Sequence, residues 1–237
     1  MFSWSFTSST MKQLINIALG SYYGFIGTLL LAVYYYPGST HADNYTLGYS
    51  MTHNFLSDLG LTITYSGAQN FLSSTLFVLA TTLVCIGLIA YFLVMPAIVN
   101  KNILSKILAQ IGSFSGILCG IAFMAVGFTP HNYYPDAHMF AVKFGFQLFL
   151  VVIVLHSISI MKNKVDLSRN LVWIYVVFML ILCYYIYLLN WGPSIKEGNG
   201  LVIHVVWQKI TVLGLSTTVF VQSFMLKSHI RALSQTS

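Results

Sequence analysis

Six long runs of apolar residues, almost free of charged side chains, constrain this chain more than any other feature. A helix rises 1.5 Å per residue, so about 20 residues cross the roughly 30 Å hydrocarbon core of a bilayer. The runs lack the polar–apolar alternation that is typical of strands in a membrane barrel. The sequence therefore predicts an all-α fold, a transmembrane bundle that forms one domain over residues 1–237. The six predicted spans cover about residues 14–36, 71–95, 107–128, 139–161, 171–190 and 201–226.

The composition supports the same fold class. Hydrophobic residues make up 57% of the 237 positions and charged residues only 7%, whereas soluble domains carry about 25% charged residues. The formal net charge is +6, but the cations stand singly or in pairs between apolar runs. A nucleic-acid-binding protein would gather them in a basic stripe. We therefore expect membrane lipids, and no nucleic acid, as partners.

The lysines and arginines predict an orientation. Only Lys196 falls between spans on one side of the predicted bundle, and the opposite side carries eight cations. Cytoplasmic loops are enriched in such cations, so we expect both termini in the cytoplasm and a multi-pass protein of the cell membrane. The first run is too long for a signal peptide, and we expect it to be retained as a span. The eight cations are Lys12, Lys101, Lys106, Lys162, Lys164, Arg169, Lys227 and Arg231.

Loops and glycines add detail to the bundle. The connection over residues 37–70 is much longer than the others, and long loops in compact proteins are usually functional, so we expect it to cap the outer end of the bundle. The second span should end before Pro96, because proline disrupts helices. Gly112, Gly116 and Gly120 are spaced by four residues. This spacing indicates close helix packing within one chain, or dimerisation as the alternative, and the oligomeric state stays open.

The titratable side chains gather at the predicted outer end. Four of the five acids and five of the seven histidines fall in outer loops or at outer helix ends. Such a cluster can supply acids, bases or ligands. Our candidate catalytic residues are Asp58, His138, His204 and His53.

Two lysines lie inside the spans, each five residues beyond one of these histidines. Lys143 follows His138, and Lys209 follows His204. A charged group at this depth is costly unless it is paired, reaches the interface or lines a polar cavity. Cations here would suit a lipid phosphate or carboxylate. The candidate ligand-binding residues are Lys143, Lys209, Asn54, Ser57 and His131.

Three interpretations of this cluster remain open, two of them chemical and one structural. One is metal-free acid–base catalysis by histidine with Asp58. Another is a zinc site, because histidine and aspartate bind zinc, although the sequence has no local spacing of the HExxH kind. The third is a hydrogen-bonded structural cap, in which Ser57 and Asp58 cap a short helix or turn.

The motifs resemble those of known six-span proteins. The segment Asn54-Phe55-Leu56-Ser57-Asp58-Leu59-Gly60, the later Val126-Gly127-Phe128-Thr129-Pro130 and His138 at the start of a span resemble a prokaryotic family called domain of unknown function number 998. They are similar, more distantly, to the Frag/DRAM/Sfk group. The resemblance implies six spans and a site in the outer loop. Its patterned positions are matched by Asn54, Ser57, Asp58, Gly60 and His138.

The resemblance also bears on function, because the Frag/DRAM/Sfk group is associated with lipid-anchor remodelling, lipid distribution and autophagy. Our leading hypothesis is a membrane protein that binds or processes a lipid or amphiphile at the outer leaflet. The alternatives are a non-catalytic transporter, a sensor, or a scaffold whose outer cluster is a structural cap. The spans lack midplane acids, which disfavours transport.

Overall fold

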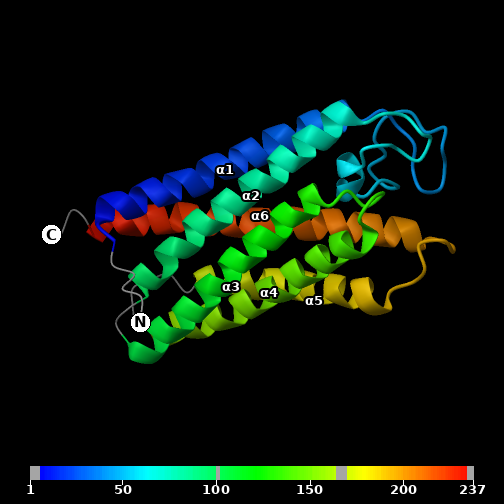
Figure 1. Ribbon diagram of the computed structural model, residues 1–237. Coiled ribbons are helices and arrows are strands. Elements are labelled where there is room, and N and C mark those ends of the chain that lie inside the picture. Colours follow the sequence, from blue (N-terminus) through cyan, green and yellow to red (C-terminus); the bar gives the residue numbers. More distant parts are fainter. Residues whose placement is uncertain (1–5, 100–101, 164–169, 234–237) are drawn as a thin grey trace.

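The computed structural model describes residues 6–99, 102–163 and 170–233, and it is helical throughout its regular parts (Figure 1). All six long helices have the length and apolar character needed to cross a membrane. The prediction of an all-α bundle with six membrane-length helices is therefore confirmed. The elements are α1 (Ser8–Tyr34), the short 3-10 helix η1 (Leu56–Gly60), α2 (Phe71–Ile98), α3 (Ile103–Phe128), α4 (Pro135–Lys162), α5 (Asn170–Trp191) and α6 (Gly200–Leu233).

The helix ends follow local chemistry, with one correction. The Thr7 side chain accepts a hydrogen bond from the Thr10 amide and caps α1. The prediction that the second span ends before Pro96 is wrong, because α2 contains Pro96 and continues to Ile98. A proline this close to the C-terminus removes one hydrogen bond but leaves only a short stretch of helix beyond it. Three of the predicted topology-setting cations, Lys101, Lys164 and Arg169, lie outside the described residues.

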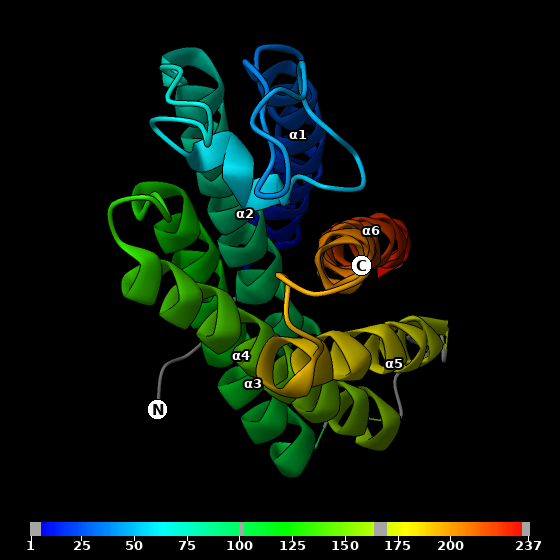
Figure 2. The ribbon, with the colours of Figure 1, turned by 90° about the vertical axis from the view of Figure 1, so that its right-hand side faces the viewer.

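The six helices form a ring. Each helix packs against its neighbour in the sequence, and α6 closes the ring by packing against α1. Figure 2 views this ring nearly end-on, with α2 and α6 on different sides of it. η1 contacts α2, α3 and α6, so it occupies the mouth of the ring. The end of the bundle that carries η1 and the loop over residues 37–70 is called the capped end below.

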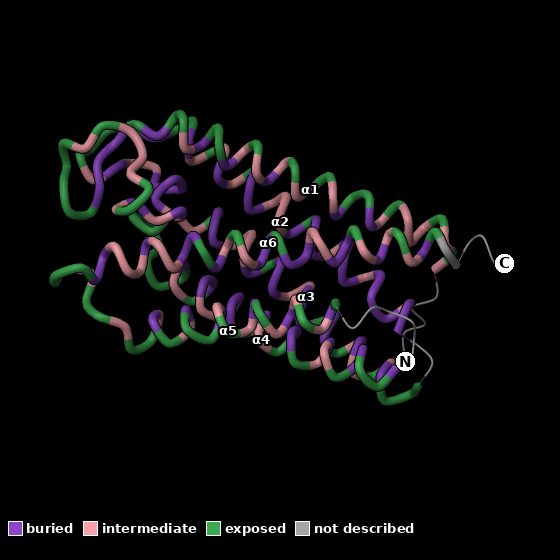
Figure 3. Tube along the Cα trace, turned by 180° about the vertical axis from the view of Figure 1, so that it is seen from behind, coloured by how far each residue is buried: buried purple, intermediate pink, exposed green. Residues whose placement is uncertain are grey.

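Burial follows the ring geometry. Buried residues face inward along each helix, and exposed residues face outward (Figure 3). The outward surface carries large apolar side chains such as Leu30, Trp173 and Leu180, which are 64%, 65% and 68% exposed. Exposed apolar surface on this scale is unfavourable in water and is expected where lipid is the solvent. The packing thus agrees with the span assignment.

The glycines of α3 serve packing within the chain. A Cβ added to Gly116 would lie 2.3 Å from Phe92 of α2, and one added to Gly112 would lie 2.5 Å from His156 of α4. Both glycines therefore let α3 approach its two neighbours closely. This observation supports the first of the two interpretations of the glycine spacing.

A buried polar network lies in the half of the bundle far from the capped end. His156 is fully buried, with its two ring nitrogens 3.3 Å from Ser113 Oγ and from the Tyr175 hydroxyl. Tyr175 lies 3.2 Å from the hydroxyl of Tyr91, which donates to Gln222 Oε1 at 2.6 Å. These five side chains, called the His156 network, connect α2 to α6 through hydrogen bonds.

Candidate functional site

The site is built on the turn that leads into η1. Asp58 Oδ2 accepts hydrogen bonds from the Phe55 amide and from Asn54 Nδ2, each at 3.0 Å. The first bond satisfies an amide at the start of η1 that has no partner within the helix. Asn54 Nδ2 also donates to the Ser39 carbonyl at 2.9 Å, which ties the start of the loop to its middle. Asp58 thus holds the fold of the loop as well as carrying a carboxyl group.

The environment of Asp58 is buried yet rich in donors. Burial raises the pKa of this carboxyl, and the hydrogen bonds from Asn54 and Tyr65 oppose that shift. The Tyr65 hydroxyl donates to Asp58 Oδ1 at 3.1 Å. Burial and the neighbouring carboxylate in turn raise the pKa of Tyr65, so the phenol keeps its proton as a donor. A perturbed carboxyl with a defined partner is typical of functional sites.

Two adjacent residues of α6 hold the loop against the bundle. Gln208 Oε1 accepts a hydrogen bond from the Leu56 amide at 2.7 Å. Lys209 Nζ donates to the carbonyl of Asn54 and lies 5.1 Å from the centre of the Tyr49 ring. A buried ammonium needs such partners because it has lost its water. The charge of Lys209 therefore anchors the loop.

A cavity of about 230 Å³ lies at the capped end, where the three loops of this end meet α4, α5 and α6. We call it the polar chamber. The walls combine imidazole, carboxyl, phenol, hydroxyl and amide groups with five apolar side chains, so the polar groups stand among apolar surface. The lining residues are His41, Phe55, Ser57, Asp58, Tyr65, His131, His138, Met139, Val142, Tyr185, Leu189, Ile195, His204 and Gln208.

Two of the chamber histidines have orientations fixed by backbone carbonyls. His138 Nδ1 lies 2.8 Å from the Thr129 carbonyl, and His204 Nε2 lies 2.9 Å from the Pro193 carbonyl. A carbonyl only accepts, so each of these nitrogens carries the proton. In the neutral ring the other nitrogen, Nε2 of His138 and Nδ1 of His204, is then an acceptor. The chamber therefore has two oriented imidazoles able to accept a proton or a hydrogen bond.

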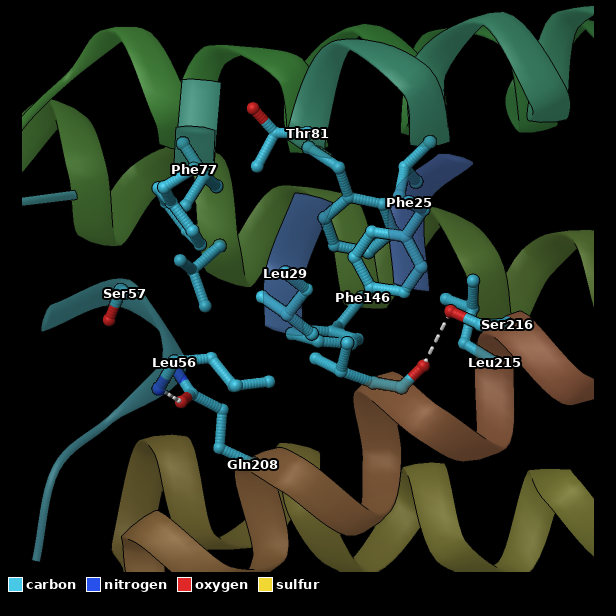
Figure 4. Close-up of a pocket in the computed structure, with 15 residues that line it drawn as sticks. Phe25, Leu29, Leu56, Ser57, Phe77, Thr81, Phe146, Gln208, Leu215 and Ser216 are labelled. Carbon is cyan, nitrogen blue, oxygen red and sulfur yellow. Dashed lines mark hydrogen bonds between the residues drawn. The ribbon is translucent and has the colours of Figure 1, made fainter. Parts of the chain in front are cut away.

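An apolar cavity of about 80 Å³ lies next to the chamber, between α1, α2, α3, α4 and α6, and Figure 4 shows the residues that line it. Phe25, Phe77 and Phe146 point into it, and Gln208 lies at one edge beside Leu56 (Figure 4). Leaving such a space empty costs on the order of 2 kcal/mol, at about 24 cal/mol per Å³. The chamber and the apolar cavity share Ser57, Val142 and Gln208 in their walls. The two spaces are therefore neighbours on either side of these residues, with polar groups around the first and mainly apolar side chains around the second.

The structure places the predicted site residues in two groups. Ser57, Asp58, His131, His138 and His204 line the chamber together, and the rings of His131 and His138 lie 5.5 Å apart. The remaining four do not line it. Asn54 supports Asp58 from behind.

The other three predicted residues have partners away from the chamber. The ring of His53 lies 2.9 Å from the Thr52 hydroxyl in the loop. Lys143 donates to Asn190 Oδ1 at 3.2 Å, between α4 and α5. Lys209 Nζ donates a hydrogen bond to the carbonyl of Asn54 in the loop. None of these three belongs to the described lining of the chamber.

Four polar lining residues were not among the sequence candidates, namely His41, Tyr65, Tyr185 and Gln208. His41 and Tyr65 lie far apart within the long loop, yet their rings are 5.7 Å apart. Gln208 is the residue before Lys209, so a polar pair at the start of the last span was the one available signal. Tyr185 has no comparable signal, because tyrosines are common near membrane interfaces.

The zinc alternative gains no support from the geometry. Within residues 6–99, 102–163 and 170–233, no three histidine, cysteine, aspartate or glutamate side chains come together in a group that could hold a metal ion. A structural zinc site needs four ligands and a catalytic one about three. The chamber histidines are therefore treated as hydrogen-bonding and acid–base groups.

The chain was compared with protein-family models, with curated proteins and with solved structures, and none of the three comparisons finds a match.

Proposed function

We propose that this protein binds an amphiphile of the outer leaflet, with the polar headgroup in the chamber. The observation that carries the proposal is that a chamber with polar groups lies next to an apolar cavity inside a ring of membrane-length helices. Ligand sites are typically concave, mostly apolar and fitted with a few convergent polar groups. A headgroup attached to a hydrocarbon chain matches the two neighbouring spaces, once the side chains between them rotate aside.

The sidedness belongs to the same proposal. The capped end faces the outside of the cell membrane and both termini are cytoplasmic, as the distribution of lysines and arginines favours. The proposed relationship to the Frag/DRAM/Sfk group, which is associated with lipids, points in the same direction. Lipid headgroups of the outer leaflet then lie at the depth of the chamber.

A second candidate function is catalysis on the bound amphiphile. It is favoured by one observation, the fixed tautomers of His138 and His204. Each ring would accept a proton at its second nitrogen and could return it to a leaving group. Asp58 would act on the site through Tyr65, because all of its described hydrogen bonds already come from Asn54, Phe55 and Tyr65.

The test is native mass spectrometry of the protein taken from bilayers that contain phosphatidylglycerol, phosphatidylethanolamine and an uncharged glycolipid. Wild-type protein should retain one headgroup class preferentially. The H138A/H204A double variant should lose about tenfold in retention, which corresponds to about 1.4 kcal/mol. Conversion of the retained lipid by the wild type, and not by the variant, would establish the catalytic candidate.

His53→Ala is the matched control, because it removes the same side chain from the same end of the molecule without touching the chamber lining. It should bind as the wild type does. Equal retention by all three proteins, with no preference among headgroups, would contradict the proposal and leave the capped end as a structural cover.

A further inference from the structure

A third space continues the row formed by the chamber and the apolar cavity. This lateral groove, of about 30 Å³, lies between α1, α2 and α6. It shares Phe25, Val84, Leu215 and Ser216 with the apolar cavity. The three spaces therefore lie in a row, each separated from the next by shared lining residues, from the capped end into the middle of the ring and then toward the contact between α1 and α6.

The outer edge of the groove is formed by two aromatic rings. Tyr22 of α1 and Phe220 of α6 stack with their centres 4.3 Å apart and their planes at 26°. Both side chains are partly exposed, and α1 packs less extensively against α6 than against α2. Two stacked aromatic side chains are held by packing, so separating them breaks no hydrogen bond between them. The α1–α6 contact thus belongs with the less extensive contacts of the ring, those of α4 with α5 and of α5 with α6, and it is the one that borders the groove.

The size and chemistry of the spaces restrict what they can hold. Apolar cavities stay dry, and an engineered cavity of about 150 Å³ accommodates a benzene ring. The apolar cavity here is about 80 Å³, which is too narrow for a sterol or another ring system. A flexible, unbranched chain can follow a row of small spaces and widen them by rotation of flanking side chains.

We propose that one unbranched hydrocarbon chain of a membrane amphiphile occupies the apolar cavity and the lateral groove, and that it enters between α1 and α6 at the Tyr22–Phe220 pair. The proposal rests on the proposed function for the identity of the headgroup, but not for the occupancy by hydrocarbon. The surrounding solvent of these helices is lipid, so such chains are present at high concentration at this contact.

The experiment uses a long-chain hydrocarbon that carries a diazirine within the chain and no polar headgroup. The full-length protein is irradiated with this probe in a bilayer, and the labelled residues are mapped. The wild type should be labelled at Phe25, Val84 or Leu215, inside the ring. Ser216→Phe places a ring at the junction of the two spaces, and overpacking of this kind excludes a ligand. We expect it to lower that labelling by about tenfold or more, as for a loss of binding.

Thr217→Phe is the matched control, since Thr217 is the next residue of α6 and is exposed outside the groove. Its labelling should stay within about twofold of the wild type, because a substitution facing lipid leaves the interior unchanged. If Ser216→Phe fails to fold, Val84→Phe against Leu79→Phe, an exposed position of α2, makes the same comparison.

Label confined to outward residues such as Leu30 and Phe224 would overturn the proposal. Equal interior labelling of the folded Ser216→Phe and Thr217→Phe variants would do the same. The H138A/H204A variant should be labelled like the wild type, because the probe has no headgroup. Interior labelling therefore supports the chain site even where headgroup retention fails, and the two proposals are tested separately.

Discussion

The polar chamber and the His156 network show two different uses of buried histidine in one bundle. His138 is 2% exposed and His156 is fully buried, yet His138 lines the chamber and His156 does not. In the network, both ring nitrogens of His156 face protein hydroxyls. In the chamber, His138 and His204 each use one nitrogen on a backbone carbonyl. Polar groups that satisfy one another join helices, whereas groups arranged around a space keep capacity for a ligand.

The largest expected effect separates these two roles. His156→Ala removes a fully buried ring and leaves the hydroxyls of Tyr175 and Ser113 without that partner. We expect a loss of about 2–4 kcal/mol of stability, combining a cavity with lost hydrogen bonds. Lipid retention per folded molecule should not change. Reversible unfolding in mixed micelles measures the first quantity and native mass spectrometry the second. A stable variant that no longer retains lipid would break the comparison.

The next effect concerns the attachment of the loop. Gln208→Leu removes the acceptor of the Leu56 amide, and an unsatisfied buried donor costs about 1–3 kcal/mol. Since η1 closes the mouth of the ring, its amides should exchange hydrogen faster while the helix cores stay protected. Gln147→Leu, at an exposed position of α4, is the control and should exchange like the wild type. Unchanged exchange at Leu56 in Gln208→Leu would show that this bond does not hold the loop.

The smallest effect is a pH dependence of the protein's stability that comes from Asp58 in the chamber wall. Burial raises the pKa of Asp58 above its ordinary value of 3.8. The folded protein therefore binds this proton more tightly than the unfolded chain does, which adds stability below pH 3.8 that is lost as the pH rises through the raised pKa. Asp58→Asn keeps an acceptor oxygen but cannot titrate. Unfolding curves at a series of pH values should converge for the two proteins at low pH and separate as the pH rises. Parallel curves would mean that Asp58 titrates as it does in water.

The helical fold could be predicted from the sequence because apolar runs of this length can cross a lipid bilayer only as helices. Each run must satisfy its own backbone, so helices follow from hydropathy alone. Helix ends were less readable, as Pro96 shows. The sequence also indicated which end of the bundle gathers histidines, since loop and span order decide that.

The detailed site was not readable, because it depends on where neighbouring side chains point. Gln208 and Lys209 are adjacent in sequence. Gln208 nevertheless lines the chamber, whereas the Lys209 ammonium donates a hydrogen bond to the Asn54 carbonyl. His41 and Tyr65 meet only through the folding of the long loop. The apolar cavity could not be predicted from the sequence, because the phenylalanines that line it do not differ in sequence from those that pack without a cavity elsewhere. Packing defects are a property of the assembled ring.

The most direct test of the central claim is an experimental structure of the protein in a lipid bilayer at a resolution that shows bound lipid. We expect continuous elongated density that begins in the chamber near His138 and His204, passes Ser57 and Gln208, and continues through the apolar cavity toward the lateral groove. Density for separate waters in the chamber, with the apolar cavity empty or closed by its own side chains, would contradict it.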